Sequence, residues 1–315
     1  MNADPFSDVT HPPLLLVSLT KFFMMLNILS YRFYSTNDAE KLTSLDEYIS
    51  RMKPEQDTIL YLPGDTKEAI LKSPILKKYQ KLGYEVLLMG DPIDEFCVQH
   101  LSEYEKRKVK SIAKDDVNII DGGDELAKKK LQKLKEMYKP LTEWFKKHLG
   151  KEIEKVQISN KLEDDPVFIL TSQYGYSAQM EKINRAQAFA NQEKAASYML
   201  AKKTLEINPH HPVIKLMLSK VKAAQAAGVE VDEEVAEYGT LLYNMGLLNS
   251  GFLIENPVDF LNPLQRLLKV GFGLEKDAPS EEIEVEIEND EDTEGTGAQE
   301  QEEPDIEGEP EIEDL

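Results

Sequence analysis

The chain has 315 residues, 41% of them hydrophobic, which is enough for one or two domains with their own cores. Its formal net charge is -21, but residues 276–315 hold nineteen Asp and Glu against one Lys, a net of -18, so the first 275 residues carry only -3. A body without a surplus of Lys and Arg argues against a nucleic-acid partner, and the single Cys97 excludes an internal disulfide and a CxxC zinc site.

Residues 1–30 form a first segment that differs from the rest of the chain. An almost continuous apolar run occupies residues 14–31, interrupted by Lys21, and its length is near that needed to span a bilayer. The run lacks the basic start and the small-residue cleavage site of a signal peptide. Two interpretations stay open: an uncleaved anchor or unusual signal peptide, and an unrelated start on a truncated gene product, which the missing signal features favour.

Residues 31–121 show a pattern typical of a βαβ unit. Apolar residues alternate in residues 57–62, and residues 84–89 are predicted to form a second strand. Residues 66–73, between them, predict a short helix. This part of the chain is therefore expected to contain a small sheet with helices packed on it.

A further helix is predicted to follow, because Asp91 is a good N-cap residue and Pro92 suits the first helical position. Its apolar side would carry Ile93, Phe96, Cys97 and Leu101. On that side, Cys97 is favoured as a small core residue over a reactive thiol. A charged strand is expected over residues 106–113.

A long amphipathic helix opens the second predicted domain, residues 122–275. Asp124 would cap this helix, Gly150 would end it, and Pro140 should kink or split it. The strands and helices expected after it are strands over 153–159 and 167–171, and helices over 178–190, 212–226, 232–247 and 257–271. In the last two helices apolar residues recur at helical spacing, so each helix can bury one stripe.

Catalytic signatures are missing from the sequence, which has no GxxxxGK[ST] loop, no GxGxxG after a strand, no HExxH and no GxSxG. The adjacent His210 and His211 lie between two prolines and indicate a surface turn before a helix, not a metal site. The basic runs 106–108 and 128–130 have acidic residues nearby, so solvated faces are favoured over anion sites. No catalytic or metal-binding residue is therefore assigned.

Residues 172–183 place Tyr174, Tyr176, Met180 and Ile183 together in one short segment. Aromatic and methionine side chains on such a segment suit a surface that repacks around varied apolar partners. From spacing alone, ordinary core is the favoured alternative.

Several segments resemble the heat-shock protein 90 (Hsp90) family of chaperones, in the expected order across residues 31–275. They are YRFYST (31–36), LTSLDEYI (42–49), GYEVLLM (83–89), DPIDEFCVQ (91–99), SQYGYSAQME (172–181), KKTLEINP (202–209) and LNSGF (248–252). Residues 172–174 and 206–209 are more similar to the endoplasmin branch than to the cytosolic proteins. The chain resembles the carboxy-terminal half of such a protein, namely the end of its middle domain and its C-terminal dimerisation domain.

The resemblance implies a mixed α/β (α+β) fold in which a small αβα end of a middle domain, residues 31–121, precedes a mixed α/β dimerisation domain, residues 122–275. The last helices of that domain would form a four-helix bundle with a second copy, which agrees with the apolar stripes, since a monomer would expose them. The acidic tail, residues 276–315, is expected to be disordered because it cannot bury enough apolar surface. The expected dimerisation residues are Tyr238, Leu241, Leu242, Met245, Leu264, Leu267 and Leu268.

In the family, the segment that matches Tyr174, Tyr176, Met180 and Ile183 contacts client proteins, and this reverses the preference for ordinary core. The family usually has tryptophan at the position of Tyr176. Tyrosine keeps the aromatic face and adds a hydroxyl group. The resemblance therefore implies client contact through these four residues, with an altered preference at Tyr176.

The resemblance further implies a molecular chaperone that binds unfolded proteins as a homodimer, with cochaperones among its partners. The full-length family uses ATP and Mg, but its nucleotide-binding domain and catalytic arginine lie upstream of the matching region. This chain is therefore predicted to hold no cofactor and to hydrolyse no ATP by itself. The endoplasmic reticulum is the predicted location, and the cytoplasm is the alternative because the chain lacks a final Lys-Asp-Glu-Leu. The alternative function is a stand-alone dimeric scaffold or adaptor without a chaperone ATPase cycle.

Overall fold

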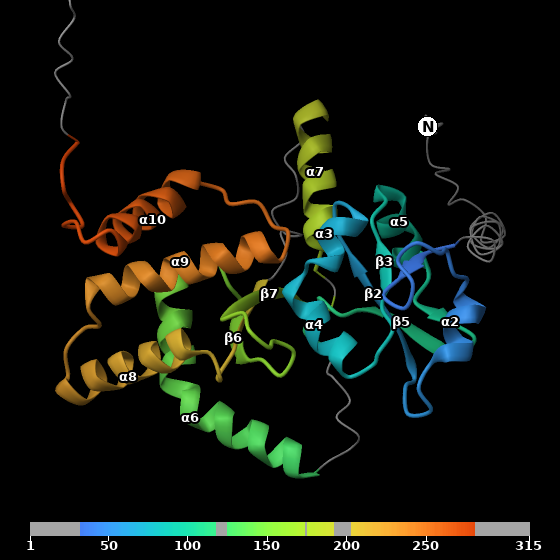
Figure 1. The fold of residues 1–315 in the computed structure, drawn as a ribbon, viewed down its shortest axis with the longest axis horizontal. Helices are drawn as coiled ribbons and strands as arrows, with labels where there is room; N and C mark the ends of the chain where they lie inside the picture. The colour runs from blue at the N-terminus through green and yellow to red at the C-terminus, as the bar shows by residue number, and fades with distance from the viewer. Residues whose placement is uncertain (1–31, 118–124, 174, 192–202, 281–315) are drawn as a thin grey trace, which may run out of the picture.

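The computed structural model describes residues 32–117, 125–173, 175–191 and 203–280, arranged as two neighbouring α+β units (Figure 1). The mixed α and β fold predicted from the sequence is confirmed. The predicted boundary between residues 121 and 122 falls in a gap of the described chain and stays a prediction. The apolar run 14–31 and most of the acidic tail lie outside the described residues.

The first unit is a five-stranded sheet with helices packed around it. The sheet has the order β1-β3-β2-β5-β4, with β2 parallel to both β3 and β5. Its strands are β1 (Tyr34–Ser35), β2 (Thr58–Pro63), β3 (Leu87–Met89), β4 (Glu103–Tyr104) and β5 (Arg107–Ser111). Its helices are α2 (Leu45–Arg51), α3 (Lys67–Leu71), α4 (Pro74–Lys81) and α5 (Pro92–His100). The predicted βαβ unit is therefore present, with a shorter second strand than expected.

Helix α5 begins as predicted, but its buried side differs from the prediction. The Asp91 backbone N–H donates to the Asp94 carboxylate at 3.1 Å, which closes the first turn. Ile93 and Phe96 are 58% and 38% exposed, whereas Asp94 and Glu95 are buried, and Cys97 is only partly buried. The prediction of a buried apolar side was wrong at these positions because Glu95 faces the second unit, where it finds a polar partner.

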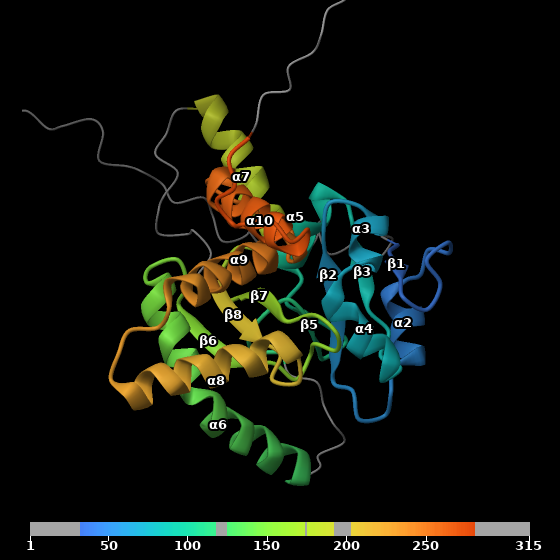
Figure 2. The same cartoon turned by 60° about the vertical axis from the view of Figure 1, so that its left-hand side comes forward.

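The second unit has a three-stranded sheet of order β6-β8-β7, covered by long helices (Figure 2). Strands β6 (Lys155–Ile158) and β7 (Val167–Thr171) were predicted, and β8 (Lys203–Ile207) was not. Helix α6 (Glu125–Leu149) continues through Pro140 as one element and changes direction along its length (Figure 1). The remaining helices, α7 (Ala178–Asn191), α8 (Pro212–Ala227), α9 (Glu233–Asn249) and α10 (Pro257–Gly271), match the predicted ranges within two residues.

Strand β7 is buried along its whole length because its two faces contribute to different cores. Val167 and Ile169 pack into the core of the second unit, with side chains from α6, α8 and α9. Phe168 and Leu170 point the other way and pack into the core of the first unit, with residues of β2 and α4. Thr171 also bridges to Lys114, which follows β5. One strand therefore forms a wall of both cores.

Candidate interaction surfaces

The start of α7 is held by one hydroxyl group that has two roles. Ser177 Oγ accepts a hydrogen bond from the Met180 N–H at 3.0 Å, which caps the helix. The same hydroxyl donates to the carboxylate of Glu95 in α5. The predicted client segment is thereby tied to the first unit.

The partly buried amine of Lys114 holds the loop that leads into α7. Lys114 Nζ donates to the backbone oxygen of Ser172 at 3.2 Å and to that of Gly175. Burial lowers the pKa of the Lys114 amine, and burial raises the pKa of the Glu95 carboxyl. The opposite charges of the two groups partly offset both effects, so they stabilise each other at this junction.

Further polar contacts fix the first turns of α7. Lys182 Nζ lies 2.5 Å from the Asp65 carboxylate, and the side-chain amide of Gln179 is placed to donate to Asp65 at 2.9 Å. Within α7, the buried Glu181 carboxylate lies 3.0 Å from the Arg185 guanidinium. The contacts of Lys182 and Gln179 with Asp65 join α7 to the first unit and so fix the orientation of the helix against it.

The structure brings two of the four predicted client residues together. Tyr176 and Met180 line one cavity of about 590 Å³ between α5, β5 and the start of α7. Met180 is 7% exposed, whereas Tyr176 and Ile183 are partly exposed. Ile183 does not line this cavity, and Tyr174 lies outside the described residues.

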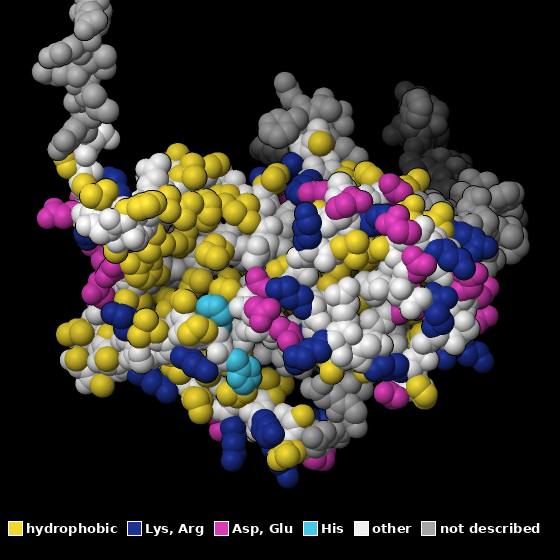
Figure 3. Space-filling view, in the orientation of Figure 1, with side chains coloured by type: hydrophobic (Ala, Val, Ile, Leu, Met, Phe, Trp, Pro, Cys, Tyr) yellow, Lys and Arg dark blue, Asp and Glu magenta, His cyan; other side chains and the backbone are white. Residues whose placement is uncertain are grey.

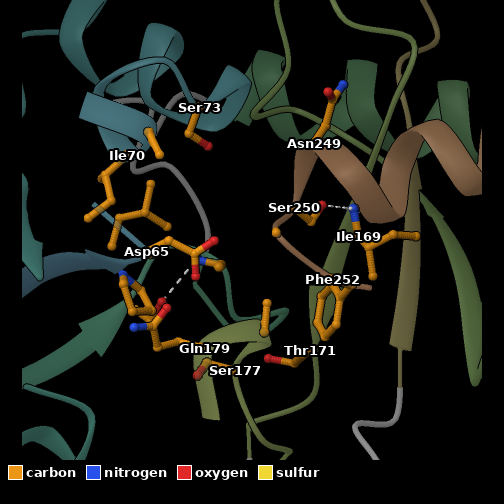
Figure 4. A pocket seen from close by; sticks show the side chains of 18 of the residues that line it. Asp65, Ile70, Ser73, Ile169, Thr171, Ser177, Gln179, Asn249, Ser250 and Phe252 are labelled. Carbon is orange, nitrogen blue, oxygen red and sulfur yellow. Dashed lines mark hydrogen bonds between the residues drawn. The ribbon is translucent and has the colours of Figure 1, made fainter. Parts of the chain in front are cut away.

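A smaller cavity of about 200 Å³ lies between the two units, beside the end of α9 (Figure 4). Asp65 and Ile70 line it from the first unit, and Ser250 and Phe252 line it from the second. Ser250 Oγ accepts a hydrogen bond from the Ile169 backbone N–H at 2.8 Å, which attaches the end of α9 to the edge of β7.

Helix α9 uses one face for the core of its own unit. Val235, Leu242 and Leu247 are buried there against α6 and the sheet. Two glycines allow this close packing, because a Cβ at Gly239 would lie 2.7 Å from Trp144 and a Cβ at Gly246 would lie 3.3 Å from Val167. Of the predicted dimerisation residues, Leu242 therefore packs inside its own subunit.

The outer faces of α9 and α10 carry exposed apolar side chains, which appear as a continuous hydrophobic area over these helices (Figure 3). None of the residues of α10 is buried. The other predicted dimerisation residues are divided between the two helices: Leu241 is buried, Tyr238, Leu264 and Leu267 are partly exposed, and Met245 and Leu268 are exposed. Arg266 lies within ion-pair distance of Glu237, which joins α10 to α9.

The sequence interpretation missed a buried polar cluster around β8. Lys161 is 1% exposed and donates through Nζ to the Lys114 backbone oxygen at 3.0 Å. The buried Glu206 carboxylate accepts hydrogen bonds from Gln157 and Ser159, each at 2.7 Å. A glutamate between Leu205 and Ile207 in a short alternating stretch was the available signal for a strand with a partnered charge.

The sequence also raised the questions of a metal site, a membrane span and a turn at His210. In the described ranges, no group of three or more His, Cys, Asp or Glu side chains could hold a metal ion, and no described helix is long and apolar enough to cross a membrane. The predicted turn at His210 is present, and His211 Nδ1 accepts from the Val213 N–H at 3.2 Å at the start of α8.

These observations describe an α+β protein whose conspicuous surfaces are apolar helical faces. The family model for the Hsp90 protein matches residues 24–303. Endoplasmin homologs of Arabidopsis thaliana and Hordeum vulgare are 40% and 43% identical to the chain over 252 residues, and a putative heat shock protein HSP 90-beta-3 of Homo sapiens is 37% identical over 236 residues. The chain belongs to the Hsp90 family and is similar to its endoplasmin members.

The matched region covers 80% of this chain in both plant comparisons and 75% in the human one. It covers only 29% of the Arabidopsis protein, 30% of the barley protein and 38% of the human protein. The chain therefore spans well under half the length of these relatives.

Proposed function

We propose that this chain acts as the carboxy-terminal half of an Hsp90-type molecular chaperone, supplying dimerisation through α9 and α10 and client contact through the start of α7. The observation that carries the proposal is α10, which buries none of its residues in its own subunit. Membership of the Hsp90 family supports a chaperone function for the protein as a whole.

The dimer would form between the outer faces of α9 and α10 of two copies. Leu268 is 54% exposed and Met245 is 37% exposed, so both are available to a partner, whereas Leu242 packs in its own core. A twofold arrangement would cover the same apolar face on both copies. The expected result is a four-helix bundle at the end of the dimer.

Client contact would use Tyr176, Met180 and Ile183 around the start of α7. The hydrogen bonds and the ion pair around the start of this helix support the proposal, because they hold its apolar side chains in place and leave some of them partly exposed. The cavity beside Tyr176 and Met180 could accept an apolar side chain of a client. The tyrosine hydroxyl would favour a more polar neighbour there than the usual tryptophan.

ATP and Mg enter the proposal only through the full-length family. We assign no contact with either to a residue of this chain and expect the chain to show no ATP turnover by itself. We also propose residence in the endoplasmic reticulum, supported by the endoplasmin homologs among the relatives.

The dimer can be tested by light scattering on the full chain with and without Leu268→Asp. An unpaired charge in an apolar bundle costs several kcal/mol, on the order known for buried unpaired charges, so the variant should have the mass of a monomer. Leu216→Asp is the matched control, because Leu216 is 59% exposed on α8, away from the proposed interface. A dimeric Leu268→Asp variant, or a monomeric natural chain, would contradict the proposed interface.

Client contact can be tested by the ability of the full chain to suppress aggregation of a heat-unfolded enzyme. Ile183→Ser should weaken suppression, since it removes a partly exposed apolar side chain of the proposed surface. Val213→Ser is the control on α8, where Val213 is 42% exposed. A dimer that suppresses no aggregation would instead support the scaffold function, and measurable ATP turnover would reveal a nucleotide site in this chain.

A further inference from the structure

Two neighbouring helices of the second unit carry a surplus of positive charge. Together α6 and α8 contain eleven lysines and three glutamates, a net of +8, although the first 275 residues as a whole carry only -3. The two helices pack against each other, and in both views they lie below α9, on the side away from α10 (Figures 1 and 2). We name as the cationic surface the exposed lysines Lys128, Lys129, Lys130, Lys133, Lys135 and Lys139 of α6 and Lys215, Lys220 and Lys222 of α8.

Few of these lysines form an ion pair. Within the described residues, only Lys128 and Lys139 of the cationic surface lie within 4 Å of a carboxylate, and those distances, 3.8 and 3.7 Å, are long. Helix α8 contains no acidic residue at all. This contrasts with Lys77, Lys78 and Lys81 of α4, each of which reaches an acidic side chain in residues 163–165.

Three of these lysines are consecutive in the sequence of α6. They are Lys128, Lys129 and Lys130, and only Lys128 lies within 4 Å of a carboxylate in the described residues. An anion placed beside them would offset these charges. The cationic surface therefore favours a flexible or extended polyanion over a single small ion.

The same chain supplies such a polyanion. Residues 281–315 contain eighteen Asp and Glu and no Lys or Arg, so they carry the opposite charge in excess of the +8 on the surface. Their sequence begins directly after Ser280, near the end of α10. At about 3.3–3.6 Å per residue, 35 residues reach up to roughly 120 Å. A folded body of this size is only about 45 Å across, so the segment can pass around α9 to α6 and α8.

We propose that the acidic residues 281–315 dock on the cationic surface of α6 and α8 of the same chain. The contact is electrostatic and requires no fixed register, since the acidic residues are spread along the whole segment and the lysines along two helices. Docking would cover a surface that otherwise attracts other polyanions, and it would release that surface when the ionic strength rises. It does not depend on the proposed chaperone function.

Energy transfer between two dyes in the full-length chain tests the proposal. In a Cys97→Ser background, Gln132→Cys on α6 and Gly308→Cys in the acidic segment provide the labelling sites. Labelled chain is mixed with a large excess of unlabelled natural chain, so that a dimer would contain at most one labelled copy and transfer reports on a single chain. High transfer is expected at about 20 mM salt, with a fall of about half or more at roughly 0.5 M, where screening is effective within a few Å.

Charge reversal supplies the decisive comparison. Changing Lys128, Lys129, Lys130 and Lys133 to Glu lowers the net charge of α6 and α8 from +8 to zero and should reduce transfer at low salt to the high-salt level. Changing the exposed Lys41, Lys72, Lys106 and Lys108 to Glu alters the charge of the whole chain equally and should leave transfer high. Equal transfer in the two variants, low transfer in the natural chain at low salt, or transfer insensitive to salt would each overturn the proposal. Low transfer within one copy, together with high transfer between a donor on one copy and an acceptor on another, would also overturn the proposal, because the segment would then dock on the partner.

Discussion

The contact between α9 and α6 at Gly239 gives a prediction that the only tryptophan of the chain can report. A Cβ at Gly239 would lie 2.7 Å from Trp144 Cη2 and 3.0 Å from Cζ3. Such distances are too short for real contacts, so Gly239→Ala must displace the indole ring. The ring is stacked on His148, with centroids 5.0 Å apart and an interplanar angle of 6°, so this stacking should be lost or altered.

The expected change in stability is the difference between two opposing effects. Replacing a helical glycine by alanine stabilises a helix by about 1 kcal/mol. Forcing an extra group into a packed contact costs about 1–3 kcal/mol. The net result should be a destabilisation of roughly 1 kcal/mol, which lowers Tm by about 2–4 °C for a unit of this size.

Thermal unfolding and tryptophan emission measure both parts of this prediction. Gly271→Ala is the matched control, because Gly271 also lies in a helix, at the end of α10, and no atom lies within 4 Å of its added Cβ. The control should raise Tm slightly and leave the emission of Trp144 unchanged. If Gly239→Ala raised Tm as much as Gly271→Ala and left the emission unchanged, the close packing of α9 on α6 would be refuted.

Two further substitutions test the junction between the units. Burial raises the pKa of the Glu95 carboxyl above its ordinary value of 4.5. The folded protein therefore binds this proton more tightly than the unfolded chain does, and stability is lost as the pH rises through the raised pKa. Glu95→Gln keeps an oxygen for the Ser177 hydroxyl and should therefore raise Tm at about pH 8 and have little effect at about pH 4. An equal shift of Tm at both pH values would argue against ionisation of a buried Glu95 carboxyl. Ser250→Ala leaves the Ile169 N–H without its acceptor and should destabilise the protein by about 1–2 kcal/mol in denaturant unfolding, whereas Ser219→Ala on the exposed face of α8 should change little.

The elements that the sequence predicted well have strong local signals. Helices α8, α9 and α10 combine apolar periodicity with prolines or acidic caps at their starts, and these signals do not depend on distant residues. Strand β7 is a run of four apolar residues between Pro166 and Thr171. Local rules were sufficient for these segments.

The errors occurred where distant residues decide the outcome. Strand β8 was missed because the charged Glu206 interrupts its run of apolar residues, and its hydrogen-bond partners Gln157 and Ser159 lie 49 and 47 residues away along the chain. The buried side of α5 was assigned wrongly because Glu95 is stabilised by Ser177, which lies 82 residues away. The dimerisation stripe on α9 could not be separated from the core stripe by spacing, since Leu241 and Leu242 fit both.

The shared position of β7 has a consequence for how the two units can move or be separated. Phe168 and Leu170 are 1% and 0% exposed because the first unit covers them. Burial of two such side chains contributes on the order of 3–6 kcal/mol. A fragment that starts after the first unit would lose that contribution and would expose a new apolar patch. The contact between the units at β7 is therefore distant along the chain from the boundary that the sequence predicts between residues 121 and 122. A movement of one unit against the other would have to keep this strand in contact with both cores, because separation would expose Phe168 and Leu170 to water.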